Sequence, residues 1–526
     1  MTKILWPTKK EGYFRSNLVK KGFPMKSSKG LKCVIKCTVR FHISILLSLY
    51  IMNPFFAFGS PTLLAVTHSI IQSQSGDSLD PLLGPSPKKL TLEDAINRAL
   101  EANRGLADAI DNVEGARLSL VTAESEFELK IFPGGQAGIT GTSDEGSDPI
   151  FGAGIALEKK FAIGTEFSIS PNIQKTGDTY QAAIDTGIVQ PLLRGIGREY
   201  NLSGVRSAEF GARSTRRTLY LRQVNTVLLT IAGVYEVIRQ RELFRLNEES
   251  AARLRVHAEA AKAKKKIGVA TQIDVYRASI QQKQAEDSLN TAREAYRDAL
   301  DNLKILLALP LEEEIEVAAP LEYNLVRLTE EEAIRTALRN RVELDQSADI
   351  VREAKRLSKV SKQNIRPKLD VVFNYSRFGS GDSFGDSAGF DEDAWGVNLV
   401  TSTDLARTAE RAAYDQSLLN VRAARRNNSL ERDNVARQVK RDLRNLRRSE
   451  KGIEIKEGQI EQVKGQLELA QVKFRWGQAN NFDLIQAETE LRLAETNLLS
   501  AVLDYIVGSH RLRAALGTLL ERPERF

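Results

Sequence analysis

The chain has 526 residues, of which 42% are hydrophobic and 27% are charged, a composition that is typical of a folded protein with several domains and excludes a disordered chain. The formal net charge of +7 comes from the first part of the sequence. Residues 1–59 hold eleven of the 75 basic residues and one of the 68 acidic residues, so the remainder has 64 and 67, a net charge of −3. A near-neutral body lacks the basic surface that a nucleic-acid-binding protein needs.

Residues 1–59 have the pattern of a signal peptide. A basic stretch is followed by an apolar run over 41–58, and Ala57-Phe58-Gly59 resembles a cleavage site with small residues. A membrane anchor is the alternative for this segment. Met25 is an alternative start to Met1, because a signal of normal length remains after it.

The exported body contains an internal repeat. The segments 90–96 and 328–334 each begin a helical pattern, with Thr91 and Thr329 as expected N-caps. A longer match at an offset of 209 residues starts with Gly268 and Gly477. Identical residues then recur at seven further pairs: Ala270 and Ala479, Asp274 and Asp483, Ala278 and Ala487, Leu289 and Leu498, Tyr296 and Tyr505, Leu303 and Leu512, Leu307 and Leu516. Both halves therefore share one plan.

Long segments of the repeat have a seven-residue apolar period that predicts helices wrapping around one another. One series is Ile453, Ile460, Leu467 and Phe474. The apolar stripe is narrow, so each helix can contact one or two neighbours but is not enclosed in a core. A helix over 204–265 would be about 90 Å long and would need partners.

Two segments, 131–191 and 367–405, alternate apolar and polar residues and predict β-strands separated by Gly-, Ser- and Asp-rich loops. The first segment is longer, which predicts an extra hairpin. Strands of about 9–11 residues match a bilayer crossing. A few strands cannot close a wide barrel, and an open sheet edge is not tolerated in lipid, so several chains would have to share one barrel.

These patterns predict an α+β membrane protein whose duplicated protomer contributes strands to a shared β-barrel and long helices to a helical tube. The expected first repeat contains the β segment 131–191 and a helical hairpin with its turn near 266–272, and the second contains the β segment 367–405 and a turn near 475–481. The expected boundaries are 1–59 for the signal peptide, 60–89 for a lead-in linker, 90–327 and 328–520 for the repeats, and 521–526 for the C-terminal end.

Two motifs resemble the TolC-like outer-membrane efflux proteins, or outer membrane factors, and the resemblance covers about 90–520. The first is the strand exit at 188–195, with Pro191 and Gly195, followed by Asn201. The second is the repeated turn motif that begins at Gly268 and Gly477. The resemblance implies a homotrimer with a transmembrane β-barrel and a periplasmic α-helical barrel. It also implies a periplasmic adaptor (membrane fusion protein) and an inner-membrane pump as partners, and no cofactor.

By resemblance, the hairpin turns form the periplasmic tip, where acidic residues can line a constriction. The gate candidates are Asp274, Asp483 and Gln486, the last standing where the family has a further acidic residue. Capping of the following helices is the alternative role for Asp274 and Asp483. The tip-turn candidates are Gly268, Gly477, Phe474 and Trp476, and the strand-to-helix junction candidates are Pro191 and Gly195. Four lysines near the first turn, Lys262, Lys264, Lys265 and Lys266, form either a solvated face or an adaptor contact.

The predicted function is the exit duct of a tripartite efflux or type I secretion system, located in the outer membrane and extending into the periplasm. A periplasmic adaptor and a coiled-coil scaffold are the alternatives. The histidines show no metal-ligand spacing, and no nucleophile motif or phosphate-binding glycine loop is present, so neither an enzyme nor a metal site is expected.

Overall fold

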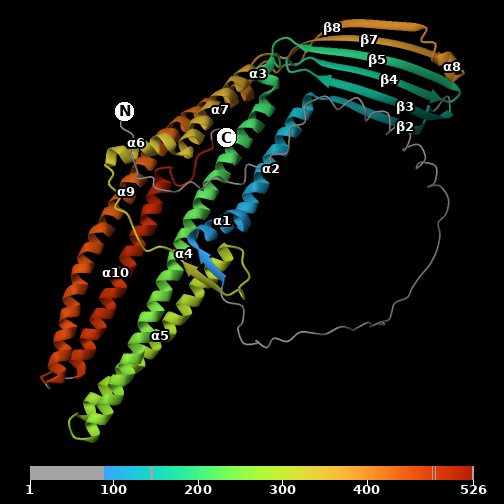
Figure 1. The fold of residues 1–526 in the computed structure, drawn as a ribbon. Helices are drawn as coiled ribbons and strands as arrows, with labels where there is room; N and C mark the ends of the chain where they lie inside the picture. Colours follow the sequence, from blue (N-terminus) through green and yellow to red (C-terminus); the bar gives the residue numbers. More distant parts are fainter. Residues whose placement is uncertain (1–87, 143–145, 477, 480, 524–526) are drawn as a thin grey trace, which may run out of the picture. The chain divides into compact units, whose positions relative to one another are not determined.

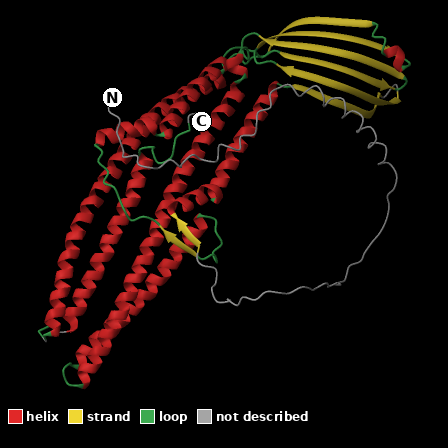
Figure 2. Ribbon diagram, viewed as in Figure 1, coloured by secondary structure: helices red, strands yellow, loops and turns green. Residues whose placement is uncertain are grey.

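The computed structural model describes residues 88–142, 146–476, 478–479 and 481–523, all within one unit, Leu83–Phe526. The expected signal peptide, most of the lead-in linker and the last three residues lie outside the described residues. Figure 1 gives the labels of the elements, and Figure 2 separates the long helices from a large and a small sheet.

The same order of elements occurs in both halves: two shorter helices, strands, a long helix, a turn and a second long helix. The first half contains β1 (Lys88–Thr91), α1 (Leu92–Ala102), α2 (Arg104–Glu124), η2 (Ser125–Phe127), β2 (Leu129–Thr142), β3 (Gly146–Lys160), β4 (Glu166–Thr176), β5 (Thr179–Pro191), α3 (Arg198–Asn201), α4 (Ser203–Lys266), α5 (Gln272–Leu306) and β6 (Ile315–Ala318). The second half contains α6 (Glu330–Asn340), α7 (Val342–Asn364), β7 (Leu369–Gly381), α8 (Phe384–Ser387), β8 (Glu392–Thr401), α9 (Thr408–Arg475) and α10 (Asn481–Ala515).

The first helix of each half starts with the same capping box. The Thr91 hydroxyl accepts a hydrogen bond from the backbone N–H of Asp94 at 3.1 Å, and the Asp94 carboxylate accepts from the backbone N–H of Thr91. Thr329 and Glu332 repeat the arrangement at the start of α6. Both expected N-caps are confirmed, because a reciprocal pair of hydrogen bonds satisfies donors that the first turn leaves free.

The six strands of the large sheet lie in the order β2-β3-β4-β5-β7-β8, and all neighbours are antiparallel. The first β segment supplies two hairpins, β2–β3 and β4–β5, whereas the second supplies β7–β8. The additional length of the first segment is thus a second hairpin in the same sheet. The halves join where Ile188 of β5 lies opposite Phe373 of β7.

Alternation gives the sheet two different faces, because directly paired residues point to the same side. One row runs from Ile131 through Leu157 and Ile169 to Thr186, Tyr375 and Trp395. The opposite face is more polar, although Phe132 and Val372 also lie on it. There, Asp185 accepts hydrogen bonds from Asn172 at 3.0 Å and from Ser376 at 2.6 Å. We refer below to the face that contains Ile169 as the apolar face and to the face that contains Asp185 as the polar face.

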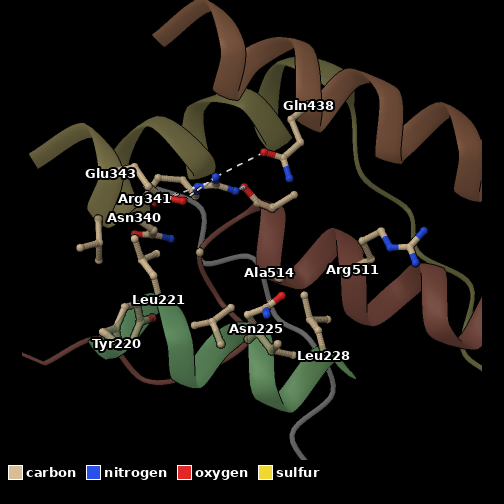
Figure 3. Close-up of a pocket in the computed structure, with 15 residues that line it drawn as sticks. Tyr220, Leu221, Asn225, Leu228, Asn340, Arg341, Glu343, Gln438, Arg511 and Ala514 are labelled. Atoms are coloured by element: carbon tan, nitrogen blue, oxygen red, sulfur yellow. Dashed lines mark hydrogen bonds and ion pairs between the residues drawn. The ribbon is translucent and has the colours of Figure 1, made fainter. Parts of the chain in front are cut away.

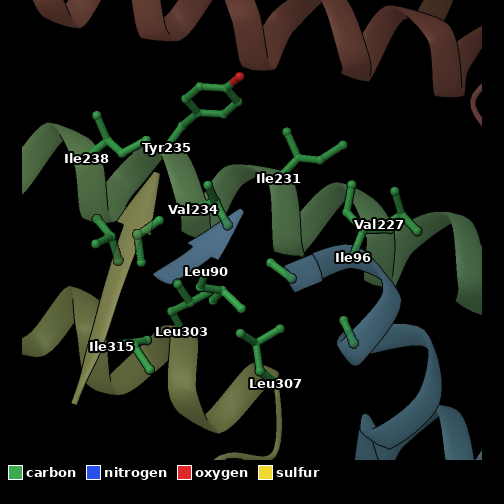
Figure 4. Packing of buried hydrophobic residues seen from close by; sticks show 14 of the residues in the cluster. Leu90, Ile96, Val227, Ile231, Val234, Tyr235, Ile238, Leu303, Leu307 and Ile315 are labelled. Carbon is green, nitrogen blue, oxygen red and sulfur yellow. The ribbon is translucent and has the colours of Figure 1, made fainter. Parts of the chain in front are cut away.

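The helices share a core where α4 crosses the small parallel sheet of β1 and β6 (Figure 4). Val227, Ile231, Val234 and Ile238 of α4 pack there against residues of α1, α5 and α10. A second cluster surrounds the fully buried Tyr505 of α10, between α6 and α9. None of the helices that the structure describes is long and apolar enough to span a membrane.

The core becomes narrower toward the hairpin turns. Near the turn of the first hairpin, the buried cluster consists of Ala258 and Ala261 of α4 with Val275 and Ala278 of α5. Alanine side chains let helix backbones approach closely but bury little apolar area, so each contact contributes little to stability. The end of the first hairpin is therefore held by few apolar contacts, which leaves room for rearrangement there.

A seam of polar side chains joins α4 to α7. The guanidinium of Arg217 forms a buried ion pair with Asp349. Arg356 donates hydrogen bonds to the Ser203 and Ser207 hydroxyls and is paired with Glu353 at 2.6 Å. Burial raises the pKa of Glu353, but the hydrogen bonds from Arg356 and Ser207 outweigh it and leave that pKa below its ordinary value. Loss of one member of a buried ion pair leaves a charge without compensation, so the pair of Arg217 and Asp349 favours the observed packing of α4 against α7.

His510 of α10 predicts a pH dependence of stability. Its Nδ1 atom is buried without a hydrogen-bond partner among the described residues, and burial, with Arg513 adding to it, lowers the pKa to about 4 from 6.5. Between these two pH values the unfolded chain binds the proton that the folded protein excludes, so stability falls as pH decreases across this window. We expect the free energy of unfolding to fall by up to about 2 kcal/mol from pH 7 to pH 5 through this group.

The measurement is urea unfolding at both pH values for the parent and for His510→Gln. Glutamine carries no titratable group, so we expect the variant to lose less stability than the parent over the same interval. His257→Gln serves as the control, because this variant keeps the buried ring of His510. An equal loss for the parent and His510→Gln would contradict this assignment.

Candidate functional site at the ends of the helical hairpins

The first hairpin turn lies between α4 and α5 and depends on Gly268. This residue has φ +81°, and its N–H donates to the Lys265 carbonyl at 3.0 Å while the N–H of Val269 donates to the Lys264 carbonyl at 3.0 Å. A residue in the left-handed conformation after a helix end allows backbone N–H groups to donate to the last free carbonyls of the helix. Glycine adopts this conformation without strain. The expected tip glycine is placed in this turn.

Asp274 lies in the first turn of α5 and completes a capping box with Thr271. Its carboxylate accepts from the Thr271 N–H at 2.9 Å and from the Thr271 hydroxyl at 2.7 Å. These side-chain and backbone hydrogen bonds hold the pKa of Asp274 below its ordinary value. The stabilisation is complete above the usual aspartate pKa and is lost as pH falls through the lowered value. Asp274 therefore caps α5, which is the alternative role expected from the sequence.

The second hairpin turn lies between α9 and α10. The Trp476 N–H donates to the Val472 carbonyl at 3.1 Å, and the Trp476 side chain is 77% exposed. Gly477 lies outside the described residues. Asp483 and Gln486 are both exposed in the first turns of α10. The Gln486 amide donates to Glu490 at 2.8 Å, so it is engaged within its own helix.

Polar contacts join the two hairpins close to their turns. Glu488 of α10 lies 3.3 Å from His257 Nε2 and 3.8 Å from Arg253 Nε, both on α4. Nearer the turns, the Lys264 ammonium lies 3.8 Å from the centre of the Phe474 ring. Phe474, expected as a tip residue without a hydroxyl, therefore takes part in a cation–π contact. We call these three contacts the hairpin links.

No local sequence pattern marks Glu488 or Arg253 as functional, and His257 has no metal-ligand spacing. The repeat offset relates α4–α5 to α9–α10 but carries no signal for which helices lie side by side across the repeats. Glu488 directly follows Ala487 in a helix with a heptad pattern. From the sequence alone, it cannot be distinguished from a glutamate on an exposed helix surface.

The hairpin ends also expose apolar side chains beside lysines. The exposed apolar residues are Ile267, Val269, Ile273, Tyr276 and Trp476. Lys262, Lys265 and Lys266 are exposed nearby, and Lys265 donates to Gln272. Clustered exposed apolar residues with a charged rim are typical of protein–protein contact sites. We refer to this surface as the tip surface.

The junction between β5 and α4 is held by a second glycine turn. Pro191 is the last residue of β5, and Gly195 has φ +93°. The Gly195 carbonyl accepts from the Asn201 amide at 2.6 Å and faces Gly164, where a Cβ atom would lie 2.5 Å from it. At the corresponding junction after β8, Arg407 has φ +50° and donates to the Ile365 carbonyl at 2.9 Å. The two junctions thus differ in their chemistry.

A cavity of about 230 Å³ lies between α4, α7 and the end of α10 (Figure 3). Its most conspicuous charged group, Arg341, pairs with Glu343 at 2.6 Å and donates to Gln438 at 3.3 Å. These polar groups satisfy each other, as expected for a gap in helix packing. Among the described residues, no three His, Cys, Asp or Glu side chains form a group that could hold a metal ion.

The fold matches solved outer-membrane channels over most of the chain. CmeC of Campylobacter jejuni superposes with a TM-score of 0.65 at 13% identity, covering 82% of this chain and 87% of that one. VceC of Vibrio cholerae gives 0.64 at 14% identity, with 81% and 96% covered. MtrE of Neisseria gonorrhoeae, solved in an open state, gives 0.63 at 16% identity, with 83% and 91% covered. No curated protein sequence matches the chain significantly.

Residues 333–518 match the family described as outer membrane efflux protein. The resemblance to TolC-like outer-membrane efflux proteins is therefore confirmed, and the predicted α+β protomer fold is that of outer-membrane channels. These findings support an efflux exit duct as the function and the outer membrane, with extension into the periplasm, as the location.

Proposed function

We propose that the chain is one protomer of a homotrimeric exit duct that passively conducts substrates received from an inner-membrane pump through a periplasmic adaptor. One observation carries the proposal: the sheet has one largely apolar face and, among the described residues, two unpaired edges, on the same chain as two long helical hairpins. Such a sheet fits a bilayer only when copies of the chain surround a common axis.

The long helices supply the remainder of the duct. α4 has 64 residues and α9 has 68, so each is about 95–100 Å long. They lead from the sheet to the hairpin turns (Figure 1). The thin alanine packing and the hairpin links make the hairpin ends the part that moves when the duct opens. Conduction of this kind needs no catalytic residue, and we propose that the chain is not an enzyme.

The tip surface fits the adaptor. Its exposed apolar side chains and lysines favour a partner that presents apolar residues and carboxylates. An adaptor identity for this chain itself is disfavoured by the second hairpin and the six-stranded sheet. A coiled-coil scaffold is disfavoured by the apolar face of that sheet.

The proposal is tested by reconstituting protein extracted from outer membranes into planar lipid bilayers. We expect discrete conductance steps that are abolished when the protein is boiled before reconstitution. Bilayers that stay silent at all voltages and protein concentrations, with a folded preparation, would contradict a conducting duct.

Asp483 is proposed to face the pore at the tip, whereas Asp274 caps α5. In a trimer Asp483→Asn removes three negative charges from the narrowest part. We expect the preference for cations over anions to fall several-fold, while Asp274→Asn leaves it unchanged. The measurement is the reversal potential in a salt gradient across a planar bilayer. Equal selectivity of Asp483→Asn and the parent would leave Asp483 with no pore-facing role.

The hairpin links are proposed to hold the tip closed. Glu488→Gln removes the charge that faces Arg253 and His257, and we expect the fraction of time spent in the open state to rise at least several-fold. Glu490→Gln is the matched control, since Glu490 lies on the same helix and contacts Gln486 and Gln466 of its own hairpin. If Glu488→Gln and Glu490→Gln spend the same fraction of time in the open state, the hairpin links do not control opening.

A further inference from the structure

The large sheet ends in two strands that each have one unpaired edge. Among the described residues, β2 pairs only with β3, and β8 pairs only with β7. Both edge strands expose large side chains on the apolar face: Leu129, Ile131 and Ile139 on β2, and Trp395, Val397 and Leu399 on β8. In hydrocarbon, the free N–H and C=O groups of such edges need partners.

The geometry of the edges fits a second copy of the same chain. Because the sheet has an even number of strands and all neighbours are antiparallel, β2 and β8 run in opposite directions. β8 of one copy can therefore lie beside β2 of the next and continue the antiparallel order. The apolar face continues across this contact only when odd-numbered residues of β8 lie opposite odd-numbered residues of β2.

The stagger of the strands restricts the register further. If paired residues are followed from strand to strand, Leu129 at the start of β2 leads to Val397 of β8. Val397 lies four residues before the end of β8 at Thr401. At the other end it connects Glu392 to Gly134, eight residues before the end of β2. The ends of β2 and β8 are thus displaced from each other along the strand direction by four residues at one end of the sheet and by eight at the other.

A closed barrel selects two registers. The stagger per copy is the displacement, in residues along the strands, between β2 of one copy and β2 of the next. With a rise of about 3.3 Å per residue and a strand spacing of about 4.8 Å, a stagger of six or eight residues tilts the strands by about 35° or 43°. Both tilts lie in the range of known barrels. A stagger of seven would move the apolar side chains of one strand to the polar face. These two values place Val397 opposite Gly135 or Ala137 of the neighbouring copy.

We propose that β8 of each copy pairs with β2 of the next in one of these registers, so that three sheets of six strands close one barrel of eighteen strands. The number of copies rests on the trimer proposed above. The backbone radius is then about 18 Å, against about 12 Å for the twelve strands that two hairpins per chain would give. The polar face with Asp185 lines a lumen of more than twice the cross-section, which suits bulky cargo.

Cysteine cross-linking tests the edge contact. The chain has two cysteines, Cys33 and Cys37, both in the expected signal peptide, so the parent is a suitable background. Val397→Cys is combined with Gly135→Cys, with Ala137→Cys or, as the control, with Gln136→Cys, which lies on the polar face. Outer membranes are oxidised and analysed on non-reducing gels after boiling.

We expect covalent dimers and trimers from one of the two odd-numbered pairs and only monomers from the Gln136→Cys pair and the single variants. No covalent oligomer from either odd pair would overturn the proposal. So would equal cross-linking of the control pair, or a disulfide within one chain, since the sheet would then close on itself.

The mass of the unboiled, detergent-extracted variants separates this inference from the proposed function. A trimer without the disulfide overturns the edge register while the duct stands, and a monomer overturns both. An electron cryo-microscopy map of the trimer counts the strands directly. Eighteen strands in one ring support the proposal, and any other number overturns it.

Discussion

Replacing Tyr505 by alanine is expected to lower the free energy of unfolding by about 3–5 kcal/mol, the range for a large buried side chain. The Tyr505 side chain is 0% exposed and packs against Tyr323 with ring centres 5.1 Å apart. It lies in the cluster that joins α10 to α9 and α6, so the cavity would open where the second repeat is assembled. The measurement is urea unfolding in detergent, followed by circular dichroism at 222 nm.

Two further variants separate the ring from the hydroxyl. The Tyr505 hydroxyl accepts from the Val326 N–H at 3.0 Å and donates to the Asn324 carbonyl at 3.3 Å. Tyr505→Phe leaves these backbone groups without that partner and is expected to cost about 1–2 kcal/mol. Tyr276→Ala, at an exposed tyrosine near the first hairpin turn, is the control and is expected to stay within about 0.5 kcal/mol of the parent. A loss below about 1 kcal/mol for Tyr505→Ala would contradict the assigned core.

Placing arginine at Ile169 is expected to destabilise the protein in a bilayer by about 2–4 kcal/mol, because the guanidinium would face hydrocarbon. Ile169 lies near the middle of the apolar face, between Leu157 and Thr186 in the strand pairing. The measurement compares the urea midpoint of protein folded into lipid vesicles with that of the parent.

Ser170→Arg is the matched control on the next residue of the same strand. Ser170 lies on the polar face opposite Asp185, so an arginine there faces water and a carboxylate. We expect its urea midpoint to stay close to that of the parent. Equal destabilisation by both arginines would show that neither face contacts lipid, and the inverse order would exchange the two faces.

Local patterns predicted the elements because their physical causes are local. Thr91 and Thr329 are recognisable as N-caps from the acidic residue three positions later, and the capping boxes follow from that spacing. The alternation of Leu369, Val371 and Phe373 predicts a strand with two different faces, and the pairing of Phe373 with Val397 extends that face to β8.

Contacts across the repeats could not be predicted from the sequence. The pairing of β5 with β7 and the contact of Glu488 with His257 depend on how two similar halves pack, and the repeat itself is silent on this point. Asp274 shows the limit for single residues. An acidic residue at a helix start satisfies both the capping and the gate hypothesis, and only its hydrogen bonds to Thr271 reveal the capping role.

The central claim is that this chain completes its structure only as three copies around one axis in the outer membrane. The most direct measurement is the mass of the detergent-extracted protein from isolated outer membranes, combined with gel migration before and after boiling. The account predicts a complex of three copies that migrates as a trimer unheated and as a monomer after boiling. A stable monomer that is recovered in the water-soluble fraction without detergent would contradict it.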